Sequence, residues 1–294
     1  MSGFSDLVWT VFSYTLPSKI YLSFKYRVIF HKRLDWKHPV CFTEKLQWLK
    51  LYGFQKEYVR MVDKVLVKEY IAGKLGAEYV IPTLGVWKSA DDIDINALPE
   101  QFVLKCNHDS GTAVVCRDKG TLNVCKTVAT IRKALKRNYY LMGRETPYKY
   151  VKRRVFAEQY IENADGTELV DYKFFCFNGE PKITKVDFGR GTRHQANYYD
   201  VDMNLLPFGV IASHPDYSRH FDKPENYEEM LGIARKLSDG IPFVRVDLYN
   251  VNGKIYFGEL TFFPTSGLQP FTDTEWDRRL GGWIVLPDKK YADE

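Results

Sequence analysis

The chain has 294 residues, of which 45% are hydrophobic and 15% aromatic, enough for a large core and two or three subdomains. Its formal net charge of +5 permits anionic partners without indicating nucleic acid, and no RNP, zinc-finger or helix-turn-helix pattern adds to that case. The five cysteines show no CxxC spacing, which is typical of reduced thiols and argues against zinc. We expect a cytoplasmic protein that binds no nucleic acid.

Residues 4–34 carry apolar side chains at roughly helical spacing, with basic side chains between them. Lys19, Lys25 and Arg27 interrupt the apolar residues, so we expect neither a secretory signal nor a membrane-spanning helix. Two interpretations stay open. The commoner one is a pair of core-facing helices. The other is a basic aromatic helix pair that rests on the inner, anionic face of a membrane or on a membrane-bound partner.

The remaining elements follow from periodicity and from turn and cap residues. Helices are expected over residues 43–51, with the N-cap at Thr43, and over 56–75, 124–142 and 227–237, with a short one after residue 271. Strands are expected over residues 79–81, 102–106, 113–117 and 152–162, and in a hairpin about an Asn-Gly turn at 178–179.

A second hairpin, around an Asn-Gly turn at residues 252–253, carries charge on one face. Alternation along the first strand puts Arg245 and Asp247 opposite the apolar side chains, and the second strand does the same for Glu259 and Thr261. A two-residue turn would send Glu259 to the other face. We therefore predict a loop of three or five residues or a compensating bulge.

Two carboxylates side by side on one strand pair repel each other unless a cation neutralises them. Oxygen ligands beside an arginine suit a Mg²⁺ ion that is also bound to phosphates. The alternative is a half-exposed hairpin in which Arg245 makes ordinary cross-strand ion pairs with Asp247 and Glu259.

A small polar loop, residues 107–112, follows Lys105 at the end of a predicted strand and contains Ser110, Gly111 and Thr112. Backbone N–H groups, hydroxyls and a lysine in this arrangement can hold phosphate oxygens. The alternative is a hairpin turn that only reverses the chain. The loop is not a Walker P-loop, because the chain has no GxxxxGK[ST].

Three further basic side chains, Arg190, Arg193 and His194, lie close together in a stretch predicted to be a polar loop. This cluster indicates an anion site. A solvated loop is the alternative for each of its members.

In order along the chain, these features resemble the ATP-grasp superfamily of carboxylate-amine ligases. The phrases EKLQWLKLY, LKCNHDSG, DYKFFCFNG and GELTFFPTSG are similar to the branch associated with teichuronopeptide and capsular polysaccharide biosynthesis, over residues 39–267. The resemblance implies an α+β ATP-grasp fold that holds a nucleotide between two mostly antiparallel sheets. It divides the chain into a helical N-terminal region with a small αβ part (1–98), a small lobe with a phosphate lid (99–164) and a large lobe with the metal and acceptor sites (165–294).

The resemblance also implies roles for individual residues. ATP would be bound by Lys64, Lys105, Ser110, Gly111 and Thr112 at the phosphates, by Glu158, Gln159 and the backbone of Tyr160 and Ile161 at the adenine, and by Asp165 or Glu168 at the ribose. Mg²⁺ would be bound by Asp247 and Glu259, with Thr261 where the superfamily usually has Asn. Lys173 and Arg245 would be catalytic, and the acceptor would lie near Arg190, Arg193, His194, Ser266 and Gly267.

The implied reaction joins a carboxylate to an amine through an acyl phosphate at the expense of ATP. We hypothesise that the carboxylate belongs to a uronic acid of a surface polysaccharide or its precursor and the amine to an amino acid or amino alcohol. Two alternatives stay open: a glycosyl- or phospho-transferase of polysaccharide assembly, and a non-catalytic nucleotide-binding scaffold. Residues 4–34 would then serve a membrane or a polysaccharide-assembly partner.

Overall fold

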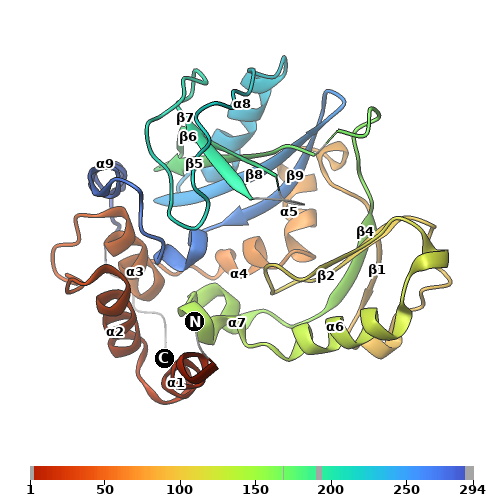
Figure 1. The fold of residues 1–294 in the computed structure, drawn as a ribbon, viewed down its shortest axis with the longest axis horizontal. Coiled ribbons are helices and arrows are strands. Elements are labelled where there is room, and N and C mark those ends of the chain that lie inside the picture. The colour runs from red at the N-terminus through yellow and green to blue at the C-terminus, as the bar shows by residue number, and fades with distance from the viewer. Residues whose placement is uncertain (1–2, 168, 190–193, 289–294) are drawn as a thin grey trace.

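The computed structural model describes residues 3–167, 169–189 and 194–288. Its two sheets are antiparallel throughout and its helices lie outside them and between them, so the predicted α+β class is confirmed (Figure 1). Alternating apolar side chains of the larger sheet pack on helices α8 (Tyr227–Ser238) and α3 (Phe42–Tyr52) in the main core.

The smaller sheet has the strand order β1-β4-β2-β3 and the larger one β7-β6-β5-β8-β9. The bounds in the smaller sheet are β1 Thr83–Trp87, β2 Phe102–Cys106, β3 Ala113–Cys116 and β4 Val155–Gln159. Those in the larger sheet are β5 Asp171–Phe177, β6 Glu180–Phe188, β7 Gln195–Tyr199, β8 Phe243–Val251 and β9 Lys254–Thr261. Strand β1 precedes residue 99, so the smaller sheet draws on the first of the three predicted segments; that division stays a prediction.

The other helices within the described residues are α1 Gly3–Thr15, α2 Ser18–Phe30, α4 Glu57–Val62, α5 Leu66–Lys74, α6 Val124–Lys136, α7 Tyr139–Gly143 and α9 Thr274–Trp283. Helix α6 packs on the smaller sheet, while α4 and α5 lie in the middle of the molecule between the two sheets (Figure 1). In the part of the chain that the structure describes, no helix combines the length and the apolarity needed to cross a membrane.

The predicted helix over residues 56–75 is wrong, because the chain breaks between α4 and α5. Asp63 accepts hydrogen bonds from the N–H groups of Val65 (2.9 Å) and Leu66 (3.2 Å), and so begins a new helix. The N–H of Lys64 donates to the carbonyl of Asn107 in the other lobe (3.1 Å). This break turns Lys64 toward the cleft between the sheets.

Four other local predictions need correction. Helix α3 is capped by Cys41, not Thr43, because the Thr43 N–H and hydroxyl both donate to buried Asp277, at 2.9 and 2.8 Å. The predicted strand over 79–81 is reduced to an isolated bridge of Val80 with Phe257, between a 3-10 turn that ends at Tyr79 and β1. The predicted helix over 124–142 is interrupted between α6 and α7. Strand β7, Gln195–Tyr199, lies within the stretch predicted to be a polar loop.

The charged hairpin resolves its register with a bulge. Its turn has two residues, Asn252 (φ 52°) and Gly253 (φ 80°), as an Asn-Gly turn favours. Asp247 pairs with Glu259 but the next pair is Leu248 with Phe257, so Gly258 is the extra residue. An added Cβ at Gly258 would lie 3.1 Å from the Asp247 carbonyl oxygen. The predicted compensating bulge is confirmed, and both carboxylates share one face.

Helix α2 bears out the core-facing interpretation of residues 4–34 on one side only, and association with a membrane or a partner stays a prediction. Buried Tyr21, Leu22 and Tyr26 attach α2 to the body of the protein. Ile20, Phe24 and Val28 follow each other at four-residue spacing and are 55%, 44% and 47% exposed. The core-facing interpretation therefore holds for one side of α2 and not for the other.

Candidate active site

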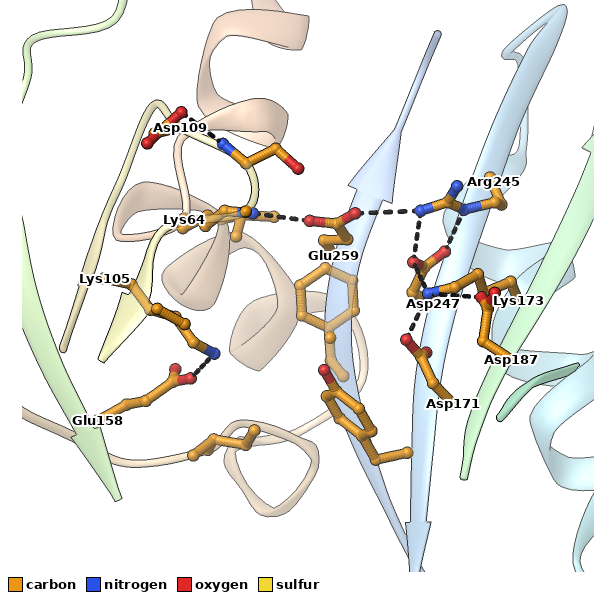
Figure 2. Close-up of a pocket in the computed structure, with 18 of the residues that line it drawn as sticks. Lys64, Lys105, Asp109, Glu158, Asp171, Lys173, Asp187, Arg245, Asp247 and Glu259 are labelled. Atoms are coloured by element: carbon orange, nitrogen blue, oxygen red, sulfur yellow. Dashed lines mark hydrogen bonds and ion pairs between the residues drawn. The ribbon is translucent and has the colours of Figure 1, made fainter. Parts of the chain in front are cut away.

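A cavity of about 590 Å³ lies between the two sheets (Figure 2). Its apolar end is formed by Val67, Val80, Ile81, Phe156 and Phe257. Six cationic and six acidic side chains line the rest: Lys64, Lys68, Lys105, Lys173, Lys185 and Arg245, with Asp109, Glu158, Asp171, Asp187, Asp247 and Glu259. The positive and negative charges of these lining side chains balance each other. An anionic ligand or a cation that enters the cavity would therefore have to replace one partner in these ion pairs.

Asp247 and Glu259 converge on one guanidinium group. They are cross-strand partners on β8 and β9, and Arg245 lies two residues before Asp247 on the same face. Nη2 of Arg245 donates to both carboxylates, at 2.6 Å to Asp247 and 3.1 Å to Glu259, and Nε donates to Asp247 at 2.6 Å. Burial lowers the pKa of Arg245, but the two carboxylates outweigh it and keep the group charged.

Lys173 is the centre of the neighbouring charge cluster. Its ammonium group donates to Asp171 and to Asp247, the latter at 2.9 Å, and lies 3.5 Å from Asp187. Burial lowers the pKa of Lys173, but these carboxylates outweigh it and raise the pKa above its usual value. Lys185 donates to Asp187 at 2.9 Å. One face of the larger sheet therefore carries a continuous row of charges across four strands.

The smaller sheet faces this row with its own ion pairs. Glu158 on β4 accepts from Lys105 on β2 and from Lys68 on α5, the latter at 3.1 Å. Burial raises the pKa of Glu158, but the two lysines outweigh it and lower the pKa below its usual value. Lys64 crosses the cleft and donates to Glu259 at 2.7 Å (Figure 2). The attraction of Lys64 is the main cause of the low pKa of Glu259.

The loop between β2 and β3 lies over the same cavity. Ser110, Gly111 and Thr112 line the cavity, and Asp109 holds the loop by accepting from the Ser110 N–H (2.9 Å) and the Thr112 hydroxyl (2.6 Å). Gly111 has φ +82° and open space around it. Such a loop can present N–H groups and hydroxyls to phosphate oxygens.

Comparison with known proteins identifies the family. A family model described as TupA-like ATP-grasp matches residues 44–285, most of the chain. The chain belongs to the TupA-like ATP-grasp family. Its fold is therefore the ATP-grasp fold, as the sequence predicts, and none of the curated proteins compared with it matches.

Several solved ligase structures are similar to this ATP-grasp chain. They include D-alanine–D-alanine ligase from Bacillus anthracis in complex with ATP (13% identity, TM-score 0.40, 69% of this chain and 54% of that one) and D-alanine–D-alanine ligase from Helicobacter pylori (16%, 0.42, 83% and 69%). Phosphoribosylamine–glycine ligase from Thermotoga maritima is a third (10%, 0.40, 70% and 49%). The chain spans between 49% and 69% of the length of these proteins.

The acidic pair of this ATP-grasp chain fits a magnesium ion that is shared with phosphates. Mg²⁺ is commonly held by one or two carboxylates, with phosphate oxygens and water completing the octahedron. Asp247 and Glu259 supply two, and the Thr261 hydroxyl donates to Glu259 at 2.9 Å. No group of three or more acidic, His or Cys side chains arranged for a metal occurs within the described residues. The pair therefore fits an ion that arrives with its phosphates.

The structure brings most of the predicted nucleotide and metal residues together. Those that line the cavity are Lys64, Lys105, Ser110, Gly111, Thr112, Glu158, Lys173, His194, Arg245, Asp247 and Glu259. Thr261 lies directly beside it, bonded to Arg245 at 3.0 Å. Their functional roles stay predictions.

Other predicted residues are not among the described residues that line the cavity, and the adenine contact predicted for the backbone of Tyr160 and Ile161 stays a prediction. Gln159 points out of β4 with its side chain exposed, and Tyr160 stacks under Arg117. Ile161 is half-buried after β4, and Asp165 is exposed and bonded to Thr167 at 2.7 Å. Ser266 and Gly267 belong to the turn after β9, and Gly267 lines a second, smaller pocket. Glu168, Arg190 and Arg193 lie outside the described residues.

Sequence reasoning assigned no role to five charged residues of the cavity: Lys68, Asp109, Asp171, Lys185 and Asp187. Strand alternation could have found the last two, since Lys185 and Asp187 stand two apart in β6. Their register with β5 places Lys185 beside Lys173 and Asp187 beside Asp171. The hairpin between β5 and β6 has a register shift between Phe175 and Cys176, and without it Lys173 would pair with Thr184 instead of Lys185.

Proposed function

We propose that this protein is an ATP-dependent carboxylate-amine ligase that forms an amide through an acyl phosphate. The observation that carries the proposal is the convergence of Asp247 and Glu259 in a cation-lined cavity between the two sheets of an ATP-grasp fold. The solved proteins named above are ligases, which supports the same reaction class. We further propose a cytoplasmic protein, with a uronic acid as carboxylate and an amino acid or amino alcohol as amine.

In this proposal ATP places its adenine at the apolar end of the cavity and its phosphates along the cations. Lys64 and Lys105 bind phosphate oxygens from the side of the smaller sheet, and Ser110 to Thr112 close over them. Mg²⁺, when bound by Asp247 and Glu259, supplies positive charge that offsets the negative charge of the phosphates. The lysine–carboxylate pairs seen at Glu158 and Glu259 would exchange for lysine–phosphate pairs.

The two chemical steps need positioned charge rather than a nucleophilic side chain. A carboxylate oxygen of the substrate attacks the γ-phosphorus, the bond to the β-phosphate oxygen breaks, and ADP and an acyl phosphate form. Lys173 and Arg245 balance the charge on the transferring group. The amine nitrogen then attacks the acyl carbon, phosphate leaves, and the nitrogen loses a proton to give the amide.

A panel of uronic acids and amines, scored by ADP formation and product mass, tests the reaction. ADP release that requires both partners supports the ligase. Consumption of a nucleotide sugar would instead select the transferase. ATP binding without turnover, unchanged in Asp247→Asn and Glu259→Gln, would select the scaffold. The exposed Asp91→Asn serves as a charge-matched control outside the cavity.

We also propose that the exposed side of α2 rests on an anionic membrane surface. Ile20, Phe24 and Val28 form an apolar stripe, and exposed Lys19 and Arg27 lie beside it. Apolar side chains bordered by basic ones are the composition that binds anionic lipid. The protein should sediment with vesicles of phosphatidylglycerol, and the Phe24→Glu variant should stay in the supernatant. Equal binding to neutral vesicles would contradict the electrostatic part.

A further inference from the structure

A second pocket of about 160 Å³ opens beside the ATP cavity and shares three residues with it: Lys185, His194 and Arg245. It is smaller than the roughly 300 Å³ at the lower end for drug-sized ligands, so it suits one small molecule or one end group. Its walls include the aromatic residues Phe42, Phe175, Tyr198 and Phe271.

The strand register explains why the two hollows differ. On one face of the larger sheet, Phe175 pairs with Arg245 and Lys185 pairs with Tyr198. On one side of these pairs the face carries the acids of the cavity, and on the other it carries aromatic rings. Arg245 and Lys185 therefore stand at the boundary between the two hollows.

The smaller pocket is rich in donors and lacks acids. No Asp or Glu is among the described residues that line it. Tyr198 and Ser213 are 3% and 4% exposed, and neither side-chain hydroxyl is hydrogen-bonded to another described residue. Nη1 of Arg245 likewise makes no hydrogen bond with described residues, whereas its other nitrogens hold Asp247 and Glu259.

Donors that line a pocket and hold no other described residue favour an acceptor-rich ligand, because such a ligand can accept their hydrogen bonds. A cationic amine would meet Lys185 and Arg245 with no carboxylate beside it in this pocket. A carboxylate would gain charge-assisted hydrogen bonds from the same groups. Burial together with the nearby cations lowers the pKa of Lys185, and an added anion would oppose that effect.

We propose, on the basis of the ligase function above, that this pocket binds the carboxylate substrate and not the amine. The carboxylate lies toward Arg245 and Lys185, next to the phosphates in the larger cavity. The body of the substrate lies against Tyr198 and the phenylalanine rings, with Ser213 and Tyr198 donating to its hydroxyl or carbonyl oxygens. The pocket thus sets which carboxylate is activated, and the amine reaches the acyl phosphate from elsewhere.

Filling the pocket tests the proposal. Ala212 lines the pocket and has an exposed side chain, whereas its neighbour Ile211 is exposed and outside the lining. We expect Ala212→Trp to raise the KM for the carboxylate about tenfold or more, without changing the KM for ATP or the amine. Ile211→Trp, the matched control, should change none of the three. A rise in the KM for the amine alone, or no change in Ala212→Trp, would overturn the proposal.

A binding measurement separates this proposal from the ligase function. Glucuronate is the probe, with glucose as its uncharged counterpart, in equilibrium dialysis with protein bound to a non-hydrolysable ATP analogue. Wild type should retain glucuronate but not glucose. Tyr198→Phe should weaken retention by about three- to tenfold through the loss of one hydrogen bond, and Ala212→Trp should abolish it. Retention of glucuronate without turnover would support the pocket assignment and contradict the ligase function. Retention that is unchanged in Ala212→Trp would contradict the pocket assignment.

Discussion

Two lysines, Lys173 and Lys50, are buried to a similar degree, with exposures of 7% and 0%, but their surroundings differ. Lys173 lies among three carboxylates of the cavity. The ammonium group of Lys50 donates to neutral oxygens instead: Oε1 of Gln47 at 2.9 Å and the carbonyl of Ser266 at 2.7 Å. Lys50 also lies 5.7 Å from the ring centroid of Phe263.

The difference shows that burial alone does not determine the state of a lysine. Burial lowers the pKa of Lys50 to about 7, with Glu145 opposing the shift only in part. Around Lys173 the same burial is outweighed, because Asp171, Asp187 and Asp247 raise the pKa. The cavity keeps a fixed positive charge beside the proposed phosphate site. The region around Lys50 holds a turn in place.

That turn follows strand β9, which carries Glu259. Thr265, Ser266 and Gly267 all have positive φ, at 48°, 58° and 61°. Such a conformation is strained for Thr and Ser and persists only when its surroundings hold it. Gln47 supports it with hydrogen bonds to the carbonyls of Ser266 (3.2 Å) and Gly267 (2.9 Å), alongside Lys50. The buried network thus fixes the end of the strand that carries Glu259.

The largest effect on stability is expected from Lys173→Met. It leaves three buried carboxylates without their common cation, and breaking a buried pair in this way costs about 3–5 kcal/mol in the free energy of unfolding. Urea denaturation at pH 7 measures the loss. Lys182→Met, an exposed lysine on the neighbouring strand β6, should stay within about 0.5 kcal/mol of wild type. Equal losses in the two variants would show that the carboxylates do not depend on Lys173.

Lys50→Met should cost less, about 1–3 kcal/mol, because the partners it leaves are mostly neutral oxygens. The same urea titration at pH 7 compares it with Lys173→Met. A loss as large as that of Lys173→Met would mean that Glu145 carries a full charge that depends on Lys50. The contrast between the two regions would then disappear.

Between pH 7 and pH 9 the two losses should depend on pH differently. Because the folded-state pKa of Lys50, about 7, lies below the unfolded value, the unfolded chain binds the extra proton between these values. The stability contributed by Lys50 therefore rises with pH, and the loss in Lys50→Met should grow by on the order of 1 kcal/mol from pH 7 to pH 9.

For Lys173 the folded-state pKa is raised, so its contribution is fully present below the unfolded pKa of about 10.4 and is lost as pH rises through the higher folded value. The loss in Lys173→Met should stay constant from pH 7 to pH 9. Urea denaturation at three pH values checks both slopes. A Lys50→Met loss that shrinks with rising pH would contradict the low pKa of Lys50.

Local patterns predicted β2 to β6, β8 and β9, because turn and alternation signals lie within a few residues of each other, but they missed β1 and β7. The conflict between an Asn-Gly turn and Glu259 even predicted the bulge at Gly258. The break at Asp63 was missed, since Asp63 is held by Arg154 from the other lobe at 3.0 Å. Lys185 was missed because its place beside Lys173 depends on strand register. Contacts between distant segments decided what sequence reasoning could not.

The smallest effect is expected from Ser266→Ala. The sequence assigns Ser266 to the acceptor site, but its hydroxyl donates to Oε1 of Glu145 at 2.8 Å and lies 3.3 Å from Nζ of Lys50. Losing that hydroxyl should lower the free energy of unfolding by about 1 kcal/mol, with the KM for both substrates unchanged. Ser218→Ala, an exposed serine bonded to Asp216, is the matched control. A large rise in one substrate's KM at unchanged stability would instead place Ser266 at the acceptor site.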